Sequence, residues 1–212
     1  MKHIDNISAL FSGGFVAHPL LETFDSGSFM MPTGKLVACD PLLTKDMLPF
    51  TVNFPTGEFT SLVHKEKESN CIAYTEIVFT DRKAVRWEMA AVPGQNLQTL
   101  KEDEIFGYPV ESGMGCFMDL ETQECLNVLE NRLFHRKGAD FMGIYEEFFH
   151  EHFFDENGAI DQFVLLKPED EKKGNIFAFE TGYGEGFYAS YIGFGENSEP
   201  VKIVTEFIEI LS

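Results

Sequence analysis

The sequence contains few basic side chains. Its 212 residues include 16 Lys and Arg against 35 Asp and Glu, which gives a formal net charge of -19. Proteins that bind nucleic acids need clustered Lys and Arg to neutralise phosphates, so this composition excludes a conventional nucleic-acid binder. It also argues against docking on an anionic membrane surface. We therefore expect neither nucleic acid nor a membrane among the partners of this chain.

Long apolar runs and paired cysteines are also absent. No segment approaches the roughly 18–20 apolar residues of a membrane span, and Asp5 lies where a signal peptide needs an unbroken apolar stretch. We expect a cytoplasmic protein. The four cysteines form no Cys-x-x-Cys pair, which excludes a zinc knuckle and a thioredoxin-like motif and predicts free thiols.

The hydrophobic content is that of a folded protein. Hydrophobic residues make up 44% of the chain, and 22 of its residues are Phe, so it can bury a sizeable core. No linker or internal repeat divides it, and we predict a single domain over residues 1–212. The acidity is uneven: residues 1–110 carry nine basic and fourteen acidic side chains, a net of -5, and residues 111–212 carry seven and twenty-one, a net of -14. This charge is typical of a solvated surface or of a field that attracts a basic partner or a cation.

The first part of the chain alternates as β-strands do. In segment 83–91, Val85, Trp87 and Met89 share one face, and Arg86 and Glu88 share the other. Further strands are predicted at 58–64 and 71–79, joined by a polar hairpin connection, and later at 161–166, 175–181, 186–194 and 201–210.

Two helices are predicted between these strands. Asp119 is placed to cap a helix at about 119–136, in which Leu126, Leu129 and Leu133 recur at helical spacing. A second helix is predicted at about 140–154, with an aromatic stripe on one side. The chain is therefore expected to be an α+β protein with mainly antiparallel β-sheets, of about nine or ten strands and sandwich or barrel-like in shape.

Two glycine clusters are candidates for ligand binding. Gly113 and Gly115 form one, and Gly184 and Gly186 belong to the other. Neither precedes a helix in the way that a dinucleotide fingerprint or a P-loop requires, so each indicates either a tight turn or a ligand held against backbone amides. Two tyrosines that follow the second cluster, Tyr188 and Tyr191, are further candidates to line such a cleft. His150 and His152 lie two residues apart on a predicted helix, point in nearly opposite directions and cannot share a metal ion.

Four segments together resemble a known family. They read GKLVACDP at 34–41, FGYPVESGMGCFMD at 106–119, FETGYGEGFYASYIGF at 179–194 and VKIVTEF at 201–207. In this order they resemble domain of unknown function 4241, a mostly bacterial family without an established activity, over about residues 34–208. The resemblance implies a fold shared with that family but no reaction.

Three acidic positions depart from the pattern of this family. Where the family usually has Asp, the chain has Glu111, Glu185 and Glu206. The charge is kept, but each side chain is longer by one methylene group. A carboxylate that must ligate a metal or act as a base at fixed reach tolerates such a change poorly. The departures therefore indicate that these residues contribute negative charge, and they argue against a catalytic role that needs a fixed carboxylate position.

Two functions remain open from the sequence. The first is a non-enzymatic binding or immunity-type interaction domain, without a cofactor, for a basic protein partner or a small ligand. The alternative is a metal-assisted hydrolase with Asp40, Glu111, Asp119 and Glu185 as candidate catalytic residues. In that case the oxygen ligands of Asp40, Asp119 and Glu185 would suit Mg²⁺, Mn²⁺ or Ca²⁺. The distances between these carboxylates decide whether they can share an ion.

Overall fold

The alternating segments of the sequence form antiparallel strands. In β5 (Arg86–Met89) the side chain of Trp87 is buried while its two neighbours are exposed, as the period of two predicts. The strands β3 (Gly57–Glu66) and β4 (Ile72–Val78) pair across the predicted hairpin connection. The computed structural model describes residues 2–14, 16–101 and 104–211.

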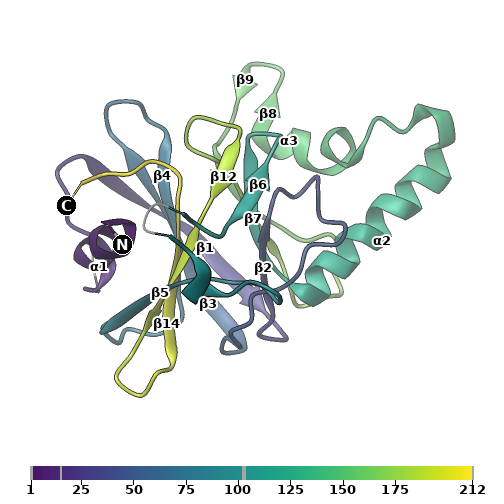
Figure 1. The fold of residues 1–212 in the computed structure, drawn as a ribbon. Coiled ribbons are helices and arrows are strands. Elements are labelled where there is room, and N and C mark those ends of the chain that lie inside the picture. The colour runs from purple at the N-terminus through teal and green to yellow at the C-terminus, as the bar shows by residue number, and fades with distance from the viewer. Residues whose placement is uncertain (1, 15, 102–103, 212) are drawn as a thin grey trace.

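Two sheets, packed face to face, make up the body of the molecule (Figure 1). The larger sheet has six strands in the order β1 (Leu21–Met31), β3, β4, β14 (Pro200–Glu206), β13 (Ser190–Phe194) and β5. The smaller sheet has four strands in the order β10 (Phe163–Leu166), β11 (Ile176–Glu180), β7 (Met114–Asp119) and β2 (Leu36–Cys39). Every pairing in both sheets is antiparallel, which confirms the predicted fold class.

Two short strand pairs raise the number of strands above the prediction. They are β6 (Tyr108–Val110) with β12 (Gly186–Tyr188), and β8 (Phe154–Asp155) with β9 (Gly158–Ala159). The predicted strand 186–194 is thus two strands, β12 and β13, that belong to different sheets. Over the described residues the two main sheets form an open sandwich and no closed barrel.

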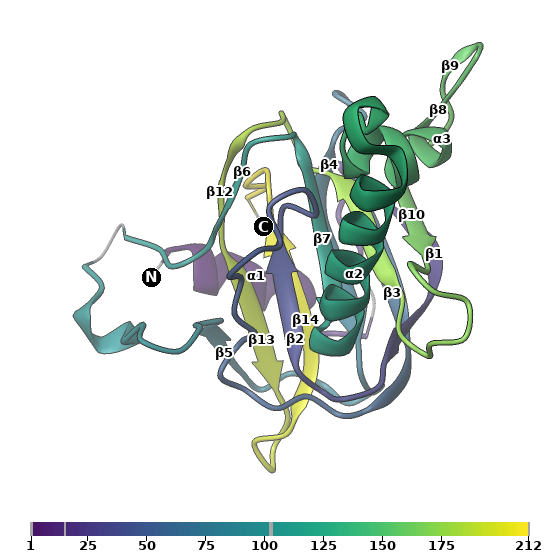
Figure 2. The ribbon, with the colours of Figure 1, turned by 90° about the vertical axis from the view of Figure 1, so that its right-hand side faces the viewer.

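Three hydrophobic cores hold the layers together. Side chains from both sheets fill the central core, including Phe29, Phe117 and Phe177. A second core lies between the smaller sheet and α2 (Leu120–Lys137), and Figure 2 shows this helix in front of that sheet. The third core lies between the outer face of the larger sheet and α1 (Lys2–Phe11). The sequence patterns did not predict this helix. The order of layers is therefore helix, large sheet, small sheet, helix.

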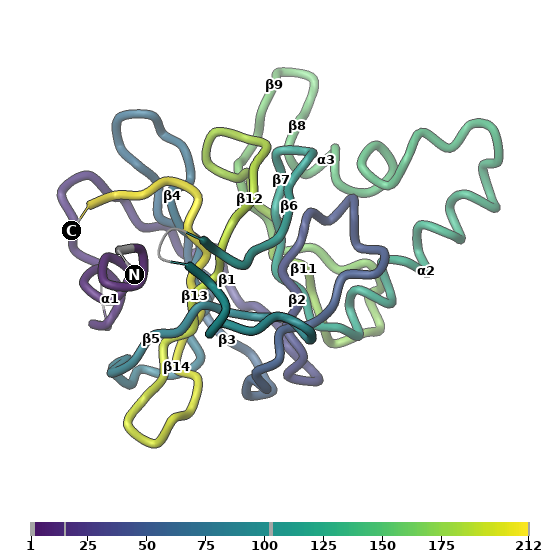
Figure 3. Tube along the Cα trace, viewed as in Figure 1, coloured from purple at the N-terminus to yellow at the C-terminus, as the bar shows by residue number. Residues whose placement is uncertain are grey.

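The first predicted helix is confirmed, and the second begins later than expected and is partly a π-helix. Asp119 caps α2 by accepting a hydrogen bond from the backbone N–H of Glu121 at 3.0 Å. In place of a helix over 140–154 the chain forms a 3-10 turn (Gly138–Asp140), a π-helix (Tyr145–Phe149) and only one α-helical turn, α3 (His150–Phe153). Gly143 has φ of +104°, outside the helical region, so no helix continues through it. The trace in Figure 3 follows this irregular connection.

No helix among the described residues is both long enough and apolar enough to cross a bilayer.

Candidate functional site

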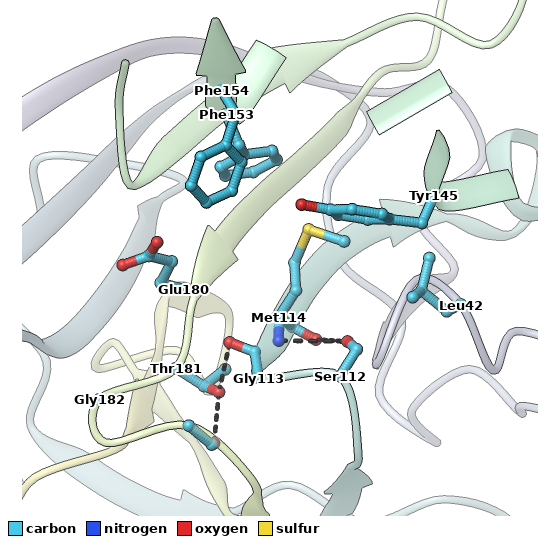
Figure 4. A pocket seen from close by; sticks show the side chains of 11 residues that line it. Leu42, Ser112, Gly113, Met114, Tyr145, Phe153, Phe154, Glu180, Thr181 and Gly182 are labelled. Atoms are coloured by element: carbon cyan, nitrogen blue, oxygen red, sulfur yellow. Dashed lines mark hydrogen bonds between the residues drawn. The ribbon is translucent and has the colours of Figure 1, made fainter. Parts of the chain in front are cut away.

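A pocket of about 540 Å³ opens where the ends of the smaller sheet meet the segment that follows α2 (Figure 4). Three parts of the chain that are far apart in the sequence form most of its wall, and these are residues 112–114, residues 145–154 and residues 180–184. Leu42, which follows β2, completes it. A volume of this size suits a small organic ligand, because such sites usually enclose about 300–1,000 Å³.

The two glycine clusters meet at this pocket. The backbone N–H and the hydroxyl of Thr181 both donate to the carbonyl of Gly113, at 3.0 Å each, and the hydroxyl also lies 2.7 Å from the carbonyl of Gly184. Gly113 and Gly184 have φ of +76° and +110°, which L-residues with side chains rarely adopt. A Cβ atom on Gly113 would lie 3.6 Å from the Cα of Gly184, an ordinary van der Waals contact, so it is the positive φ that favours glycine at this position. The glycines therefore allow two backbone turns to pack together as one wall of the pocket.

Asp40 fixes the first of these turns. Its side chain is buried, with 1% relative exposure. One carboxylate oxygen accepts hydrogen bonds from the backbone N–H groups of Glu111 at 3.0 Å and Ser112 at 2.8 Å, and the other accepts one from Leu42 at 2.9 Å. Three backbone amides thus surround one carboxylate. This arrangement ties the end of β2 to the turn that precedes β7.

Apolar and aromatic side chains form the opposite wall. The π-helix places Tyr145 over the pocket, and the last residue of α3 and the first of β8 contribute Phe153 and Phe154. Figure 4 shows these rings and the thioether of Met114 directed toward the same space. Behind the wall, the imidazole of His150 stacks on the ring of Phe154 with centroids 5.7 Å apart and also contacts Tyr145 edge-on at 5.7 Å. These contacts restrain the orientation of both rings.

Glu180 supplies the charge of the pocket. It ends β11 and is half-buried, and the described residues include no hydrogen-bond or ion-pair partner for its carboxylate. No Lys, Arg or His is among the residues that line the described pocket. Burial raises the pKa of the Tyr145 hydroxyl, and the charges of Glu146 and Glu180 raise it further. The pocket therefore combines apolar walls with one unpaired negative charge.

The four candidate carboxylates form no common metal site among the described residues. Asp119 is paired with Leu36, the first residue of β2, and Asp40 directly follows the last residue of that strand. Leu36 and Asp40 are four positions apart, so Asp119 and Asp40 lie at opposite ends of a segment about 13 Å long at the usual strand rise. Ligands of one Mg²⁺ or Ca²⁺ lie within bonds of roughly 2.0–2.6 Å, and this separation is too large for both to bind one ion. Asp119 instead accepts hydrogen bonds from the backbone N–H groups of Thr33 at 2.9 Å and Gly34 at 3.2 Å.

The other two carboxylates lie at the surface. Glu111 and Glu185 are exposed, and neither is among the residues that line the pocket. Within the described ranges there is no group of three or more His, Cys, Asp or Glu side chains with the geometry of a metal site.

The other residues predicted to bind a ligand, two glycines and two tyrosines, contact neighbouring side chains or backbone groups of the protein itself. A Cβ on Gly115 would lie 2.7 Å from the ring of Phe179, and a Cβ on Gly186 would lie 2.7 Å from the ring of Tyr188. Tyr188 donates a hydrogen bond to the carbonyl of Gly184 at 2.8 Å, so it supports the second glycine turn from behind. Tyr191 lies on the outer face of the larger sheet in the core beneath α1, away from the pocket.

The pocket residues that matter most for chemistry were missed by sequence reasoning. Tyr145 belongs to the aromatic stripe of the second predicted helix, Phe153 and Phe154 lie at the end of that segment, and Glu180 lies beside the second glycine cluster. The position of Glu180 directly before Thr-Gly was the one signal that could have identified it. The aromatic residues gave no such signal, because neighbouring aromatic side chains such as Phe149 are buried in the core.

Comparison with known families agrees with the segments that carry the resemblance. A family model described as protein of unknown function (DUF4241) matches residues 29–205, which is most of the chain. The chain belongs to the DUF4241 family. This DUF4241 member matches no curated protein and no solved structure. Both turns of the pocket, at 112–114 and 180–184, lie within the matched region.

Proposed function

We propose that this DUF4241 protein is a non-enzymatic binding protein that holds a small ligand in the pocket between its two glycine turns. The observation that carries the proposal is the construction of the pocket. A buried carboxylate, Asp40, and two glycines with positive φ, Gly113 and Gly184, fix one wall without filling the space in front of it. A fixed, concave and mainly apolar space with few polar groups is typical of a ligand site.

The polar groups of the pocket support binding rather than nucleophilic chemistry. The hydroxyl of Ser112 accepts a hydrogen bond from the backbone N–H of Met114 at 3.2 Å, and the hydroxyl of Thr181 is hydrogen-bonded to backbone carbonyls. Nucleophilic catalysis needs a base within hydrogen-bonding distance of the nucleophile. Among the described pocket residues neither hydroxyl has a His or a carboxylate as a hydrogen-bond partner.

Methionine-methyl NMR tests this proposal directly. The probes are three molecules with the same phenyl ring: 2-phenylethanol, 2-phenylethylammonium and 3-phenylpropionate. We expect at least one to shift the methyl resonance of Met114, which lines the pocket, while the resonance of the exposed Met142 stays in place. The variant Leu42→Trp fills part of the pocket and should abolish the shift. The matched control is Val128→Trp, an exposed position on α2, which should leave it intact.

The proposal fails if none of the three probes moves the Met114 resonance at millimolar concentration. It also fails if the Leu42→Trp variant binds as the wild type does, because the ligand would then occupy another place.

A further inference from the structure

We propose that the ligand of this pocket is an organic cation, namely a protonated amine or a quaternary ammonium group attached to an apolar body. This inference rests on the proposed binding function and names the chemical class of its ligand. It is carried by the juxtaposition of the unpaired Glu180 carboxylate with the aromatic side chains of Tyr145, Phe153 and Phe154 at one cavity.

The carboxylate of Glu180 is the first argument. It is half-buried beside apolar walls and lacks an ion-pair or hydrogen-bond partner among the described residues. Removing a charged group from water without a partner is unfavourable. A positive charge bound in the pocket would offset this cost and would form a charge-assisted hydrogen bond if the ligand carries N–H groups.

The aromatic wall is the second argument. The faces of aromatic rings attract cations, and recognition of alkylated ammonium groups by several rings is a recurring use of this attraction. Figure 4 shows Phe153 and Phe154 on the side of the pocket where the Glu180 carboxylate lies, and Tyr145 on the other side, next to Met114. His150 packs against both Tyr145 and Phe154 and so holds these two rings in place before a ligand arrives.

The charge of the surroundings is the third argument. An anionic ligand would meet Glu180 with no cationic lining residue to offset the repulsion among the described residues. Beyond residue 110 the chain carries 21 acidic and 7 basic residues, so the long-range field on this part of the molecule also attracts cations. The volume of about 540 Å³ leaves room for much more than an ammonium group. The apolar side chains opposite Glu180 are therefore expected to contact a hydrocarbon or aromatic body.

Isothermal titration calorimetry with the three phenyl probes tests the class of ligand. We expect 2-phenylethylammonium to bind about tenfold more tightly than 2-phenylethanol at low salt, and 3-phenylpropionate to bind most weakly. In Glu180→Gln the cation and the neutral probe should bind equally. In Glu180→Lys the order of the two charged probes should reverse. The matched control is Glu185→Gln, which removes an exposed charge outside the pocket and should leave the preference unchanged.

The outcomes separate the two proposals. If the neutral probe binds as tightly as the cation in the wild type, or if Glu180→Gln keeps the preference for the cation, the inference about charge is wrong while the binding function stands. If no probe binds, both are wrong. A Gly-Gly-Lys-Gly-Gly peptide distinguishes the sources of the cation. Because it lacks a ring, it should bind more weakly than 2-phenylethylammonium, and tighter binding of the peptide would overturn the assignment to a small molecule.

Discussion

At the scale of single residues, Asp40 shows how one buried side chain determines the shape of a surface pocket. Asp-Pro is a common turn sequence, and in the alternative prediction of a hydrolase Asp40 was a candidate metal ligand. In the structure both carboxylate oxygens are occupied by three backbone N–H groups. These hydrogen bonds position the turn at 111–113, and that is the role of Asp40 that the structure supports.

Replacing Asp40 by Asn should destabilise the protein strongly. The amide group of Asn would direct an N–H donor at backbone N–H groups, and it would lose the charge that strengthens the present hydrogen bonds. We expect a loss of about 3 kcal/mol in the free energy of unfolding, measured by urea denaturation. Glu185→Gln is the control, because Glu185 is exposed, and it should change stability by less than about 0.5 kcal/mol. Equal effects of the two substitutions would contradict the positioning role.

Predictions for single residues were correct where the local sequence determines the backbone conformation. The cap at Asp119 and the positive φ of Gly113 depend on backbone geometry that Asp and Gly favour. The partner of a side chain on a distant strand has no such local signature. The sequence therefore indicated Tyr188 and Tyr191 alike, although only Tyr188 supports a turn of the pocket and Tyr191 packs beneath α1.

At the scale of elements, the larger sheet carries an unexpected buried ion network beneath α1. Glu76 on β4 lies 3.1 Å from the Nε2 atom of His64 on β3 and 2.5 Å from the Nζ atom of Lys202 on β14. All three side chains are buried. Lys202 also donates to the carbonyl of Gly13 at 3.2 Å, just beyond the end of α1. The network thus links three neighbouring strands to the segment that follows the first helix.

The pH dependence of stability tests this network. Burial alone would raise the pKa of Glu76, but its hydrogen bond with His64 and the charge of Lys202 outweigh burial and hold the pKa below the ordinary value of 4.5. A carboxyl whose pKa is lower in the folded state stabilises the fold above its unfolded pKa, and this contribution is lost as the pH falls through the folded pKa. Glu76→Gln should therefore cost about 3 kcal/mol near pH 7, because Lys202 is left buried without its counter-charge.

Urea denaturation of the wild type and Glu76→Gln across a pH series provides the measurement. We expect the difference between the two unfolding free energies to shrink as the pH falls below about 4.5, where the unfolded-state carboxyl takes up a proton. Glu196→Gln, at an exposed position, is the control and should show no such trend. A difference that stays constant down to the lowest pH would show that the charge of Glu76 does not stabilise the fold.

Periodicity predicted regular elements well and irregular ones poorly. The strands β3, β4 and β5 and the helix α2 follow from alternation, spacing and a cap. The segment after α2 has helical spacing of aromatic residues, yet Gly143 with a positive φ interrupts it and a π-helix follows. The spacing reflects which side chains are buried, and it does not determine whether the backbone between them is continuous.

At the scale of the whole molecule, the net charge of -19 produces a field that attracts cations and also destabilises the compact state. Like charges repel each other more strongly in the compact state than in the unfolded chain. We expect the thermal unfolding midpoint to rise as NaCl is increased from about 0.01 to 0.15 M, because the screening length falls from about 30 to 8 Å over this range. KCl should produce the same rise. A midpoint that falls with either salt would indicate that attractive ion pairs outweigh the general repulsion.

The pocket is a property of the whole molecule rather than of a motif. Its walls come from the end of β2, the turn before β7, the irregular segment after α2 and the end of β11. The sequence identified two of these parts through their glycines. The arrangement that places Tyr145 and Phe154 near Glu180 depends on how the smaller sheet packs against the segment after α2, which no local pattern reveals.

A crystal structure of the protein with 2-phenylethylammonium bound tests the central claim most directly. We expect the ammonium nitrogen within hydrogen-bonding distance of the Glu180 carboxylate and against the rings of Phe153 and Phe154, with the phenyl group toward Met114 and Leu42. A molecule bound at another surface, or one in this pocket with its ammonium group turned away from Glu180, would contradict the account.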